Sequence, residues 1–346
     1  MNVVFSSSDL YTKCTGIAMY SLLKNNIDLY ELNIYVITTD MTETNKSIIK
    51  EMCDSYGRQV IFIDGNEALS RAKKEMDLLD FKGGLNTYAR ALANRILPED
   101  IDKALFLDSD LLINGSLKPL DDLDLGDNIV AGVCEVSVLI RNLCYEDSTL
   151  LEKCKNYINY GVALFSLANW RKHNGDERIR QCIANAEAPF RVAEQSILNL
   201  AFKDYTLKLP LKYNYSTYLH GIPYEKMSKW YQRRRVFSED EYCEAEKAPI
   251  IIHFIGDYFN RPWYENNICR YKEVYMNYYG ESPWSECDLD KKPENISRVF
   301  RMYYCLLIFL RKNKFDTAYF KARYVYVQWL REHVTDLDGR VKRTTE

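Results

Sequence analysis

The sequence predicts an α/β fold in which a mixed, largely parallel sheet is flanked by helices. Short apolar, strand-like segments alternate with amphipathic helical segments over residues 2–64, in the order β-α-β-α-β. Such an order produces parallel strands joined by right-handed crossovers. The net charge of −3 over 346 residues and the hydrophobic content of 47% indicate a globular protein. Near-neutral charge argues against a nucleic-acid partner, which would favour a basic excess.

The first half of the chain contains four predicted strands. The apolar segments 2–7, 31–39, 58–64 and 103–107 are expected to be strands. Helices are expected at 15–24, 42–55, 66–79 and 86–97, where apolar residues recur at helical spacing. Thr42 is suited to cap the second of these helices, and Gly83–Gly84 separates the last two.

The second half is predicted to be mixed. Strands are expected at 128–136, 157–167 and 248–256, with one helix beginning at the "NWRKH" segment and another at 194–202. From about residue 295 to 334 the chain becomes helical, aromatic and basic in character. Its longest clean apolar run, 302–310, is too short for a bilayer span, which needs about 20 residues.

Cysteine usage favours a reducing compartment. The chain has ten cysteines, none in a C-x-x-C pair, and several lie in apolar or helical patterns typical of buried thiols. The chain opens on a strand-like segment rather than on a secretory leader pattern. We therefore expect reduced cysteines and a cytoplasmic protein rather than a disulfide framework.

The segment "KALFLDSDLLINGSLKPL", residues 103–120, carries the first candidate site. Asp108 and Asp110 follow a predicted buried strand and, two positions apart, point the same way in extended backbone. Ligands bind beyond the carboxyl ends of strands in open α/β sheets, and paired carboxylates there suit Mg²⁺ or Mn²⁺. A solvated loop with two capping aspartates is the alternative.

His253 extends this candidate metal site. It is the one histidine of four that ends an apolar predicted strand. An imidazole added to two carboxylates shifts the preference from Mg²⁺ toward Mn²⁺ and leaves coordination positions open for a diphosphate. A structural histidine is the alternative.

Two further polar groups adjoin predicted elements. Asn159–Tyr160–Gly161 lies in the "INYGVALFSL" segment, where a simple turn is the alternative. Glu194 and Gln195 begin a short helix, where an acidic first-turn residue is also favourable in itself. The chain contains no G-x-x-x-x-G-K-[ST], no G-x-G-x-x-G after its first strand, no G-x-S-x-G and no H-E-x-x-H motif, which argues against P-loop and dinucleotide-binding functions.

Six segments in order over about residues 2–264 resemble glycosyltransferase family 8, the family of glycogenin and of bacterial galactosyl- and glucosyltransferases. These segments are "VVFSSSDLY", "NTYARALANRILP", "KALFLDSDLLINGSLKPL", "YINYGVALFSLANWRK", "EQSILNLAF" and "IIIHFIGDYFNRPW". The resemblance implies a GT-A fold, a UDP-glucose or UDP-galactose donor, and retention at the anomeric carbon. It also implies a glycan or lipid-linked glycan acceptor.

The resemblance assigns roles to individual residues. Asp108, Asp110 and His253 would bind Mn²⁺, with Mg²⁺ possible. The expected nucleotide-binding residues are Ser7, Asp9, Tyr11, Ser109, Gly256 and Arg261. The expected sugar-binding residues are Arg90, Asn159, Tyr160, Gly161 and Glu194. Gln195 would lie near the anomeric carbon, with Glu194 as the contrasting catalytic candidate. Because an amide is a poor nucleophile, front-face attack assisted by the departing phosphate is the expected mechanism.

The chain departs from the family pattern at several of these positions. Ser8-Asp9-Leu10-Tyr11 stands where two acids and Asn-Tyr are usual. Tyr160 replaces the usual Ala, and Arg261 replaces Lys. Glu194 and Ser196 stand in place of two Asp residues. These changes bear on base recognition and on the shape of the sugar pocket.

Two regions are expected, a catalytic domain over 1–270 and a helical C-terminal region over 271–346. Residues 297–334 hold eight Lys/Arg against Asp316 and Glu332, with aromatic residues between them. This composition suits either a peripheral helix on an anionic membrane, such as the inner face of the plasma membrane, or a helical pair packed on the domain. A non-catalytic nucleotide-sugar-binding protein and a UDP-sugar phosphohydrolase remain alternatives to the transferase.

Overall fold

The computed structural model describes most of residues 1–291 and parts of the chain beyond them. The described residues are 1–76, 88–135, 156–185, 193–217, 219–230, 236–255, 261–265, 267, 269–291 and scattered residues between 302 and 325.

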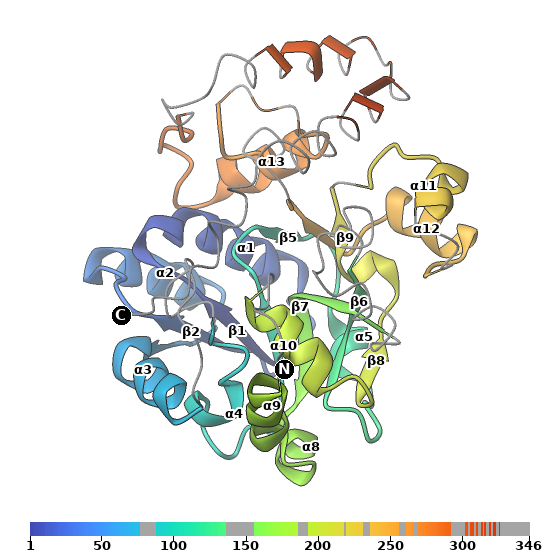
Figure 1. The fold of residues 1–346 in the computed structure, drawn as a ribbon. Helices are drawn as coiled ribbons and strands as arrows, with labels where there is room; N and C mark the ends of the chain where they lie inside the picture. Colours follow the sequence, from blue (N-terminus) through green and yellow to red (C-terminus); the bar gives the residue numbers. More distant parts are fainter. Residues whose placement is uncertain are drawn as a thin grey trace.

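A seven-stranded mixed sheet forms the centre of the molecule (Figure 1). Its strands are β1 (Asn2–Ser6), β2 (Asn33–Thr38), β3 (Val60–Asp64), β4 (Lys103–Leu107), β6 (Val130–Cys134), β7 (Ile158–Ser166) and β8 (Thr206–Lys208). They lie in the order β3-β2-β1-β4-β7-β6-β8. The first four are mutually parallel, β7 runs antiparallel to both β4 and β6, and β8 is parallel to β6. The predicted α/β class is therefore confirmed, with the expected parallel opening and mixed second half.

Helices cover both faces of this sheet (Figure 1). The α-helices of the described residues are α1 (Thr12–Asn25), α2 (Glu43–Ser55), α3 (Gly65–Glu75), α4 (Ala93–Ile96), α5 (Lys118–Asp121), α8 (Leu167–Lys172), α9 (Gly175–Ala184), α10 (Ala193–Ala201), α11 (Tyr224–Trp230), α12 (Glu239–Lys247) and α13 (Lys272–Glu281). Successive side chains of β1 point to opposite faces of the sheet and pack in two separate clusters of the core. Val3 and Phe5 pack in the cluster that contains α1 and α2, whereas Val4 packs in the one that contains α3, α4, α8 and α10.

A second, small sheet brings distant segments together at the carboxyl end of β4. It consists of β5 (Leu111–Ile113), β10 (Ile251–His253) and β9 (Tyr215–Ser216), with β10 in the middle. β10 pairs antiparallel with β5 and parallel with β9, so that His253 faces Leu111 on one side and Ser216 on the other. This register places His253 next to the aspartates that precede β5.

The predicted elements differ from the structure mainly at their ends. The helix expected over 86–97 is confirmed only in part of its described residues, because Ala93–Ile96 are α-helical whereas residues 88–92 lie in 3₁₀ and turn conformations. The strand expected over 248–256 is limited to Ile251–His253. Residues 254–255 are irregular, since Phe254 N–H donates to the Asp110 carbonyl outside the ladder.

The segment that follows residue 270 packs closely on α1 (Figure 1). The contacts are made by α13 and by the chain beyond it. A Cβ atom at Gly16 would lie 2.0 Å from the Trp284 ring, so only glycine allows this approach. Lys13 Nζ forms an ion pair with Asp290 at 2.5 Å. Residues 272–290 are therefore bound tightly to the first helix of the fold.

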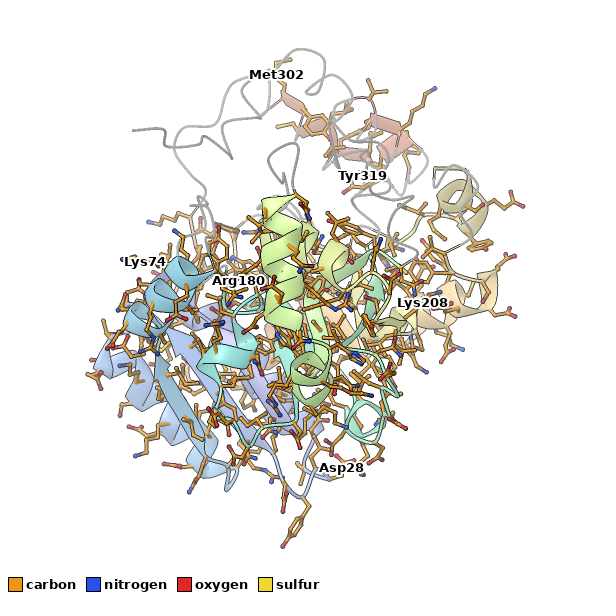
Figure 2. The ribbon with its side chains drawn as sticks, turned by 60° about the horizontal axis from the view of Figure 1, so that its bottom comes forward. Asp28, Lys74, Arg180, Lys208, Met302 and Tyr319 are labelled. Carbon is orange, nitrogen blue, oxygen red and sulfur yellow. The ribbon has the colours of Figure 1, made fainter. Side chains whose placement is uncertain are left out.

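The described residues between 302 and 325 are largely helical. In Figure 2, Met302 and Tyr319 lie toward one end of the molecule and Asp28 toward the other. Tyr319 is buried with Leu307 against the core, whereas Met302, Leu306, Phe309, Phe315 and Val325 are exposed. No helix among the described residues is long and apolar enough to cross a membrane.

Candidate active site

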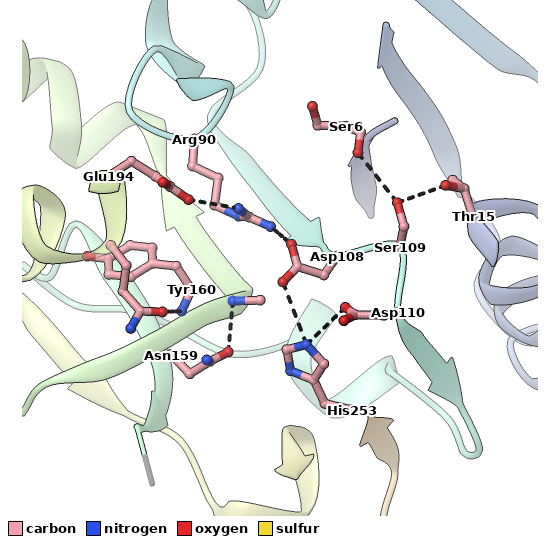
Figure 3. Close-up of polar contacts among 12 residues, drawn as sticks. Ser6, Thr15, Arg90, Asp108, Ser109, Asp110, Asn159, Tyr160, Glu194 and His253 are labelled. Atoms are coloured by element: carbon pink, nitrogen blue, oxygen red, sulfur yellow. Dashed lines mark hydrogen bonds and ion pairs between the residues drawn. The ribbon is translucent and has the colours of Figure 1, made fainter. Parts of the chain in front are cut away.

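Asp108, Asp110 and His253 come together where β4 ends and the small sheet begins (Figure 3). One ligand atom from each lies within 4.8 Å of the others. His253 Nε2 is 3.1 Å from Asp110 Oδ1 and 3.6 Å from Asp108 Oδ2. The two carboxylates and the imidazole that are predicted to bind a metal together therefore lie next to one another in the structure.

Gly161 on β7 makes room for this cluster. A Cβ atom there would lie 2.3 Å from His253 Cε1 and 2.7 Å from Asp108 Oδ2. The backbone is drawn in by a hydrogen bond of 2.9 Å, in which Asp108 N–H donates to the Gly161 carbonyl. Any side chain at position 161 would therefore fill the space in which the three ligand groups meet.

His253 and Asp110 stabilise each other's charged forms. Burial alone lowers the pKa of His253, but the charge and hydrogen bond of Asp110 outweigh it and raise that pKa. Burial alone raises the pKa of Asp110, but the charge and hydrogen bond of His253 outweigh it and lower that pKa. Two carboxylate oxygens and one imidazole nitrogen fit a divalent cation that accepts mixed oxygen and nitrogen ligands. The residues present therefore fit a metal such as Mn²⁺.

Arg90 joins this cluster to Glu194 on α10 (Figure 3). Its guanidinium forms ion pairs with Asp108 and, at 3.4 Å, with Glu194 Oε1. Burial raises the pKa of Glu194 to about 7, although Arg90 opposes the rise. Arg90 and Glu194, which are expected to bind the sugar, thus lie beside the candidate metal ligands. The charge of Glu194 is expected to change near neutral pH.

We expect Glu194→Gln to change how stability depends on pH. Because the folded-state pKa of Glu194 is raised, its contribution to stability is present in acid and is lost as pH rises through about 7. The amide that replaces this carboxyl group does not titrate, so the variant loses no stability from this position as pH rises. The free energy of unfolding of the variant minus that of the wild type should therefore increase between pH 5 and 8, by about 3 kcal/mol at most. Thermal melts of metal-free protein at several pH values measure this difference.

The matched control for this experiment is Glu177→Gln. Glu177 lies on α9, where its half-exposed side chain forms an ion pair of 2.9 Å with Arg180. Its replacement should leave the pH dependence of stability as in the wild type. A difference between Glu194→Gln and wild type that stays constant from pH 5 to 8 would contradict the assignment of a raised pKa to Glu194.

Asn159, Tyr160 and Gln195 form a hydrogen-bonded group on the other side of Gly161. Gln195 Oε1 accepts from the Tyr160 backbone N–H at 3.2 Å, and Asn159 Oδ1 accepts from the Gly161 N–H at 2.9 Å. The predicted sugar-binding residues therefore adjoin the metal ligands. Tyr160 itself is 1% exposed and packs its ring toward Phe165 in the core.

Sequence reasoning missed two residues of this group, Glu135 and Asn214. Asn159 Nδ2 donates to Glu135 Oε2, and Asn214 Nδ2 donates to Asn159 Oδ1 at 2.9 Å. Glu135 lies just beyond β6, so the rule applied to Asp108, a carboxylate at the end of a buried strand, could have found it. No spacing or motif singles out Asn214.

The expected nucleotide-binding residues lie at the ends of β1 and β4. Thr15 Oγ1 is 2.7 Å from Ser7 Oγ and 2.8 Å from Ser109 Oγ, which holds the loop after β1 against the Asp108–Asp110 segment. Asp9 Oδ1 accepts hydrogen bonds from the backbone and side chain of Thr42 and from Asn45, which lower the pKa of Asp9. These bonds fix the loop that presents Tyr11, whose side chain is 42% exposed.

Arg261 lies beside the cluster, with Nη2 4.0 Å from Asp110 Oδ2 and the guanidinium 5.6 Å from the centre of the Trp263 ring. Its Nε is buried and has no hydrogen-bond partner in the described structure. A buried, unpaired guanidinium nitrogen is costly, and an anion beside the metal would satisfy it. Gly256, the other residue expected at the diphosphate, lies outside the described residues.

Comparisons with known proteins agree with this geometry. The chain is 24% identical over 287 residues to general stress protein A of Bacillus subtilis, a match that covers 82% of this chain and 95% of the relative. It is 24% identical over 290 residues to a lipopolysaccharide 1,2-glucosyltransferase of Escherichia coli, covering 82% of this chain and 79% of the relative. It spans 58% of the length of a Haemophilus influenzae relative with which it is 26% identical.

Solved structures show the same fold. The galactosyltransferase LgtC, in complex with donor and acceptor sugar analogues, superposes with a TM-score of 0.61 at 22% identity, covering 87% of this chain and 99% of that one. The bifunctional glycosyltransferase WbbM superposes with a TM-score of 0.67 at 20% identity, covering 82% of this chain and 50% of that one. The predicted GT-A type fold is thus confirmed. The sequence pattern of glycosyl transferase family 8 matches residues 2–267, and the chain belongs to that family.

Proposed function

We propose that this protein is a metal-dependent, retaining hexosyltransferase that transfers glucose or galactose from a UDP-sugar to a glycan or lipid-linked glycan. The observation that carries this proposal is the Asp108–Asp110–His253 cluster with Arg261 beside it. Three ligands that leave open coordination positions, next to a partly exposed guanidinium with an unpaired Nε, suit a diphosphate that contacts both a metal and the guanidinium. Mn²⁺ bound there would supply Lewis-acid stabilisation of the leaving diphosphate.

The remaining residues hold the sugar and the nucleotide. Arg90 and Glu194 offer a donor and an acceptor to the hexose hydroxyls, and Asn159 orients the backbone around Gly161. Tyr11 offers an exposed ring to the uracil. Gln195 would face the anomeric carbon, where a front-face reaction needs no protein nucleophile. The names of the relatives, a lipopolysaccharide glucosyltransferase and a galactosyltransferase bound to sugar analogues, support a hexose donor and a glycan acceptor.

A screen of nucleotide sugars tests this function. Release of UDP is measured from UDP-glucose, UDP-galactose and other UDP-sugars with Mn²⁺ or Mg²⁺, with and without oligosaccharide and lipid-linked acceptors. We expect release that depends on the metal and accelerates when an acceptor is added, with the anomeric configuration retained in the product. Equal rates with and without acceptors would indicate transfer of the sugar to water only, and UMP with sugar 1-phosphate as products would indicate a UDP-sugar phosphohydrolase instead. Tight binding of the UDP-sugar without turnover would indicate the non-catalytic alternative.

We also propose that the C-terminal region attaches the protein to the cytoplasmic face of an anionic membrane. The basic and aromatic composition of residues 297–334 motivates this, as do the exposed apolar side chains of Met302, Phe309 and Phe315. Deletion of residues 297–346 should abolish sedimentation with anionic vesicles while donor hydrolysis persists. Full-length protein that fails to bind such vesicles, or a deletion variant that is unfolded by circular dichroism, would favour a region packed on the domain.

A further inference from the structure

We propose that Asn214 is a positioning residue that fixes the tautomer of His253 and connects the metal ligands to the sugar-binding group. This inference rests on the proposed metal site and adds to it a residue outside the ligand set. Asn214 is 4% exposed and lies between the short helix η3 (Leu211–Tyr213) and β9. It is therefore held by backbone on both sides, at hydrogen-bond distance from His253 Nδ1.

A continuous series of hydrogen bonds runs through Asn214. His253 Nδ1 is 2.9 Å from Asn214 Oδ1, and Asn214 Nδ2 is 2.9 Å from Asn159 Oδ1. Asn159 Nδ2 reaches Glu135 Oε2, and Gln195 Nε2 is 3.5 Å from the same oxygen. The series thus links a metal ligand at one end with the predicted catalytic amide at the other.

The direction of every bond in the series follows from its carboxylate end. An ionised Glu135 can only accept, so the group of Asn159 that faces it must be the NH₂. Asn159 Oδ1 then faces the other way and accepts from both the Gly161 N–H and the Asn214 NH₂. Asn214 must therefore present its carbonyl oxygen to His253. The oxygen and NH₂ ends of an amide have nearly the same shape, so the orientation of each amide is assigned from which neighbouring group donates and which accepts a hydrogen bond.

These bond directions determine that His253 Nδ1 carries a proton. A carbonyl oxygen at 2.9 Å requires a proton on His253 Nδ1. Nε2 faces the Asp110 carboxylate at 3.1 Å and gives up its proton when a cation takes that place, so that the Nε2 lone pair then points between Asp108 and Asp110. This is the tautomer that a metal ligand needs, and the orienting hydrogen bond also increases the basicity of the ring.

Two substitutions separate the two bonds that Asn214 makes. Asn214→Leu keeps the approximate volume and removes both bonds, so the Kd for Mn²⁺ should rise by about 10- to 100-fold. Asn214→Asp keeps an acceptor toward His253 but places a second acceptor against Asn159 Oδ1. It should bind Mn²⁺ with nearly wild-type affinity, while kcat/KM for the UDP-sugar falls about tenfold because Asn159 Oδ1 loses the hydrogen bond from position 214 and faces a second acceptor there. Electron paramagnetic resonance of free Mn²⁺ measures the first quantity in the presence of UDP, and UDP release measures the second.

Asn26→Leu is the matched control. Asn26 is a buried amide, 1% exposed, that bonds the Leu22 carbonyl and the Leu117 N–H at the end of α1. It should lose thermal stability as Asn214→Leu does and keep wild-type affinity for Mn²⁺. A folded Asn214→Leu with wild-type Mn²⁺ affinity overturns the proposal. If Asn214→Leu does not fold, Asn214→Asp provides the test. Loss of Mn²⁺ affinity in Asn214→Asp, or a kcat/KM for the UDP-sugar equal to that of the wild type, would overturn the proposal as well. Failure of the wild type to bind Mn²⁺ would instead count against the proposed function.

Discussion

Asp110→Asn is expected to lower Mn²⁺-dependent turnover by about 10³-fold or more. A metal contributes several kcal/mol of charge stabilisation at a developing anion, and each 1.4 kcal/mol corresponds to a tenfold change in rate. Asp110 is the carboxylate nearest to His253 Nε2, at 3.1 Å, and it also faces Arg261. An amide there keeps the shape of the side chain but removes the charge that a divalent cation needs. Asp108→Asn should have a similar effect and, in addition, release Arg90.

The measurements for this prediction are Mn²⁺ affinity, UDP release and thermal stability. Both variants should remain folded, because Asp108 and Asp110 keep 34% and 21% of their side chains exposed. Asp122→Asn is the matched control, since that carboxylate pairs only with Lys118 on the surface in the described structure. It should show wild-type activity. Wild-type turnover that persists undiminished in EDTA would overturn the assignment of a catalytic metal.

The part of the site that lies on long elements could be predicted from the sequence. The strand β4 is a continuous apolar run, so its end, and with it Asp108 and Asp110, could be located by pattern alone. The same holds for Glu194 and Gln195, which open a helix with clear apolar spacing. Long elements impose a periodicity on their residues, and the residues at their ends acquire a predictable direction from it.

The part that depends on short elements could be predicted only for His253, as the histidine that ends an apolar strand. β5 and β9 are three and two residues long, which is too short to show any alternation. Their pairing with β10, which brings His253 to Asp110 and places Asn214, just before β9, at hydrogen-bond distance from His253 Nδ1, could not be predicted. The helix expected over 86–97 begins too early for a related reason. An apolar segment that is buried as turns has the same composition as one that is buried as helix, so the pattern alone does not separate residues 88–92 from Ala93–Ile96.

Gln195→Ala is expected to lower kcat by about 10²- to 10³-fold, the range for removal of one preorganised dipole, while UDP affinity stays near the wild-type value. Gln195 is buried in the first turn of α10, and its orientation is fixed at both ends, by the Tyr160 N–H and by Glu135. Its carbonyl oxygen keeps one lone pair for the positive charge that develops at the anomeric carbon, and an amide held in this way needs no reorganisation as that charge forms.

The design of this experiment separates chemistry from binding. Gln181→Ala on α9 is the matched control, because that amide contacts only the exposed Glu177 in the described structure and should leave kcat unchanged. UDP affinity is measured by calorimetry with Mn²⁺ present, and kcat by UDP release at saturating donor. Equal losses of affinity and turnover would show that Gln195 merely supports the pocket. A covalent glycosyl adduct trapped on Glu194 would replace the front-face mechanism by a double displacement, because that carboxylate, unlike the amide beside it, can act as a true nucleophile.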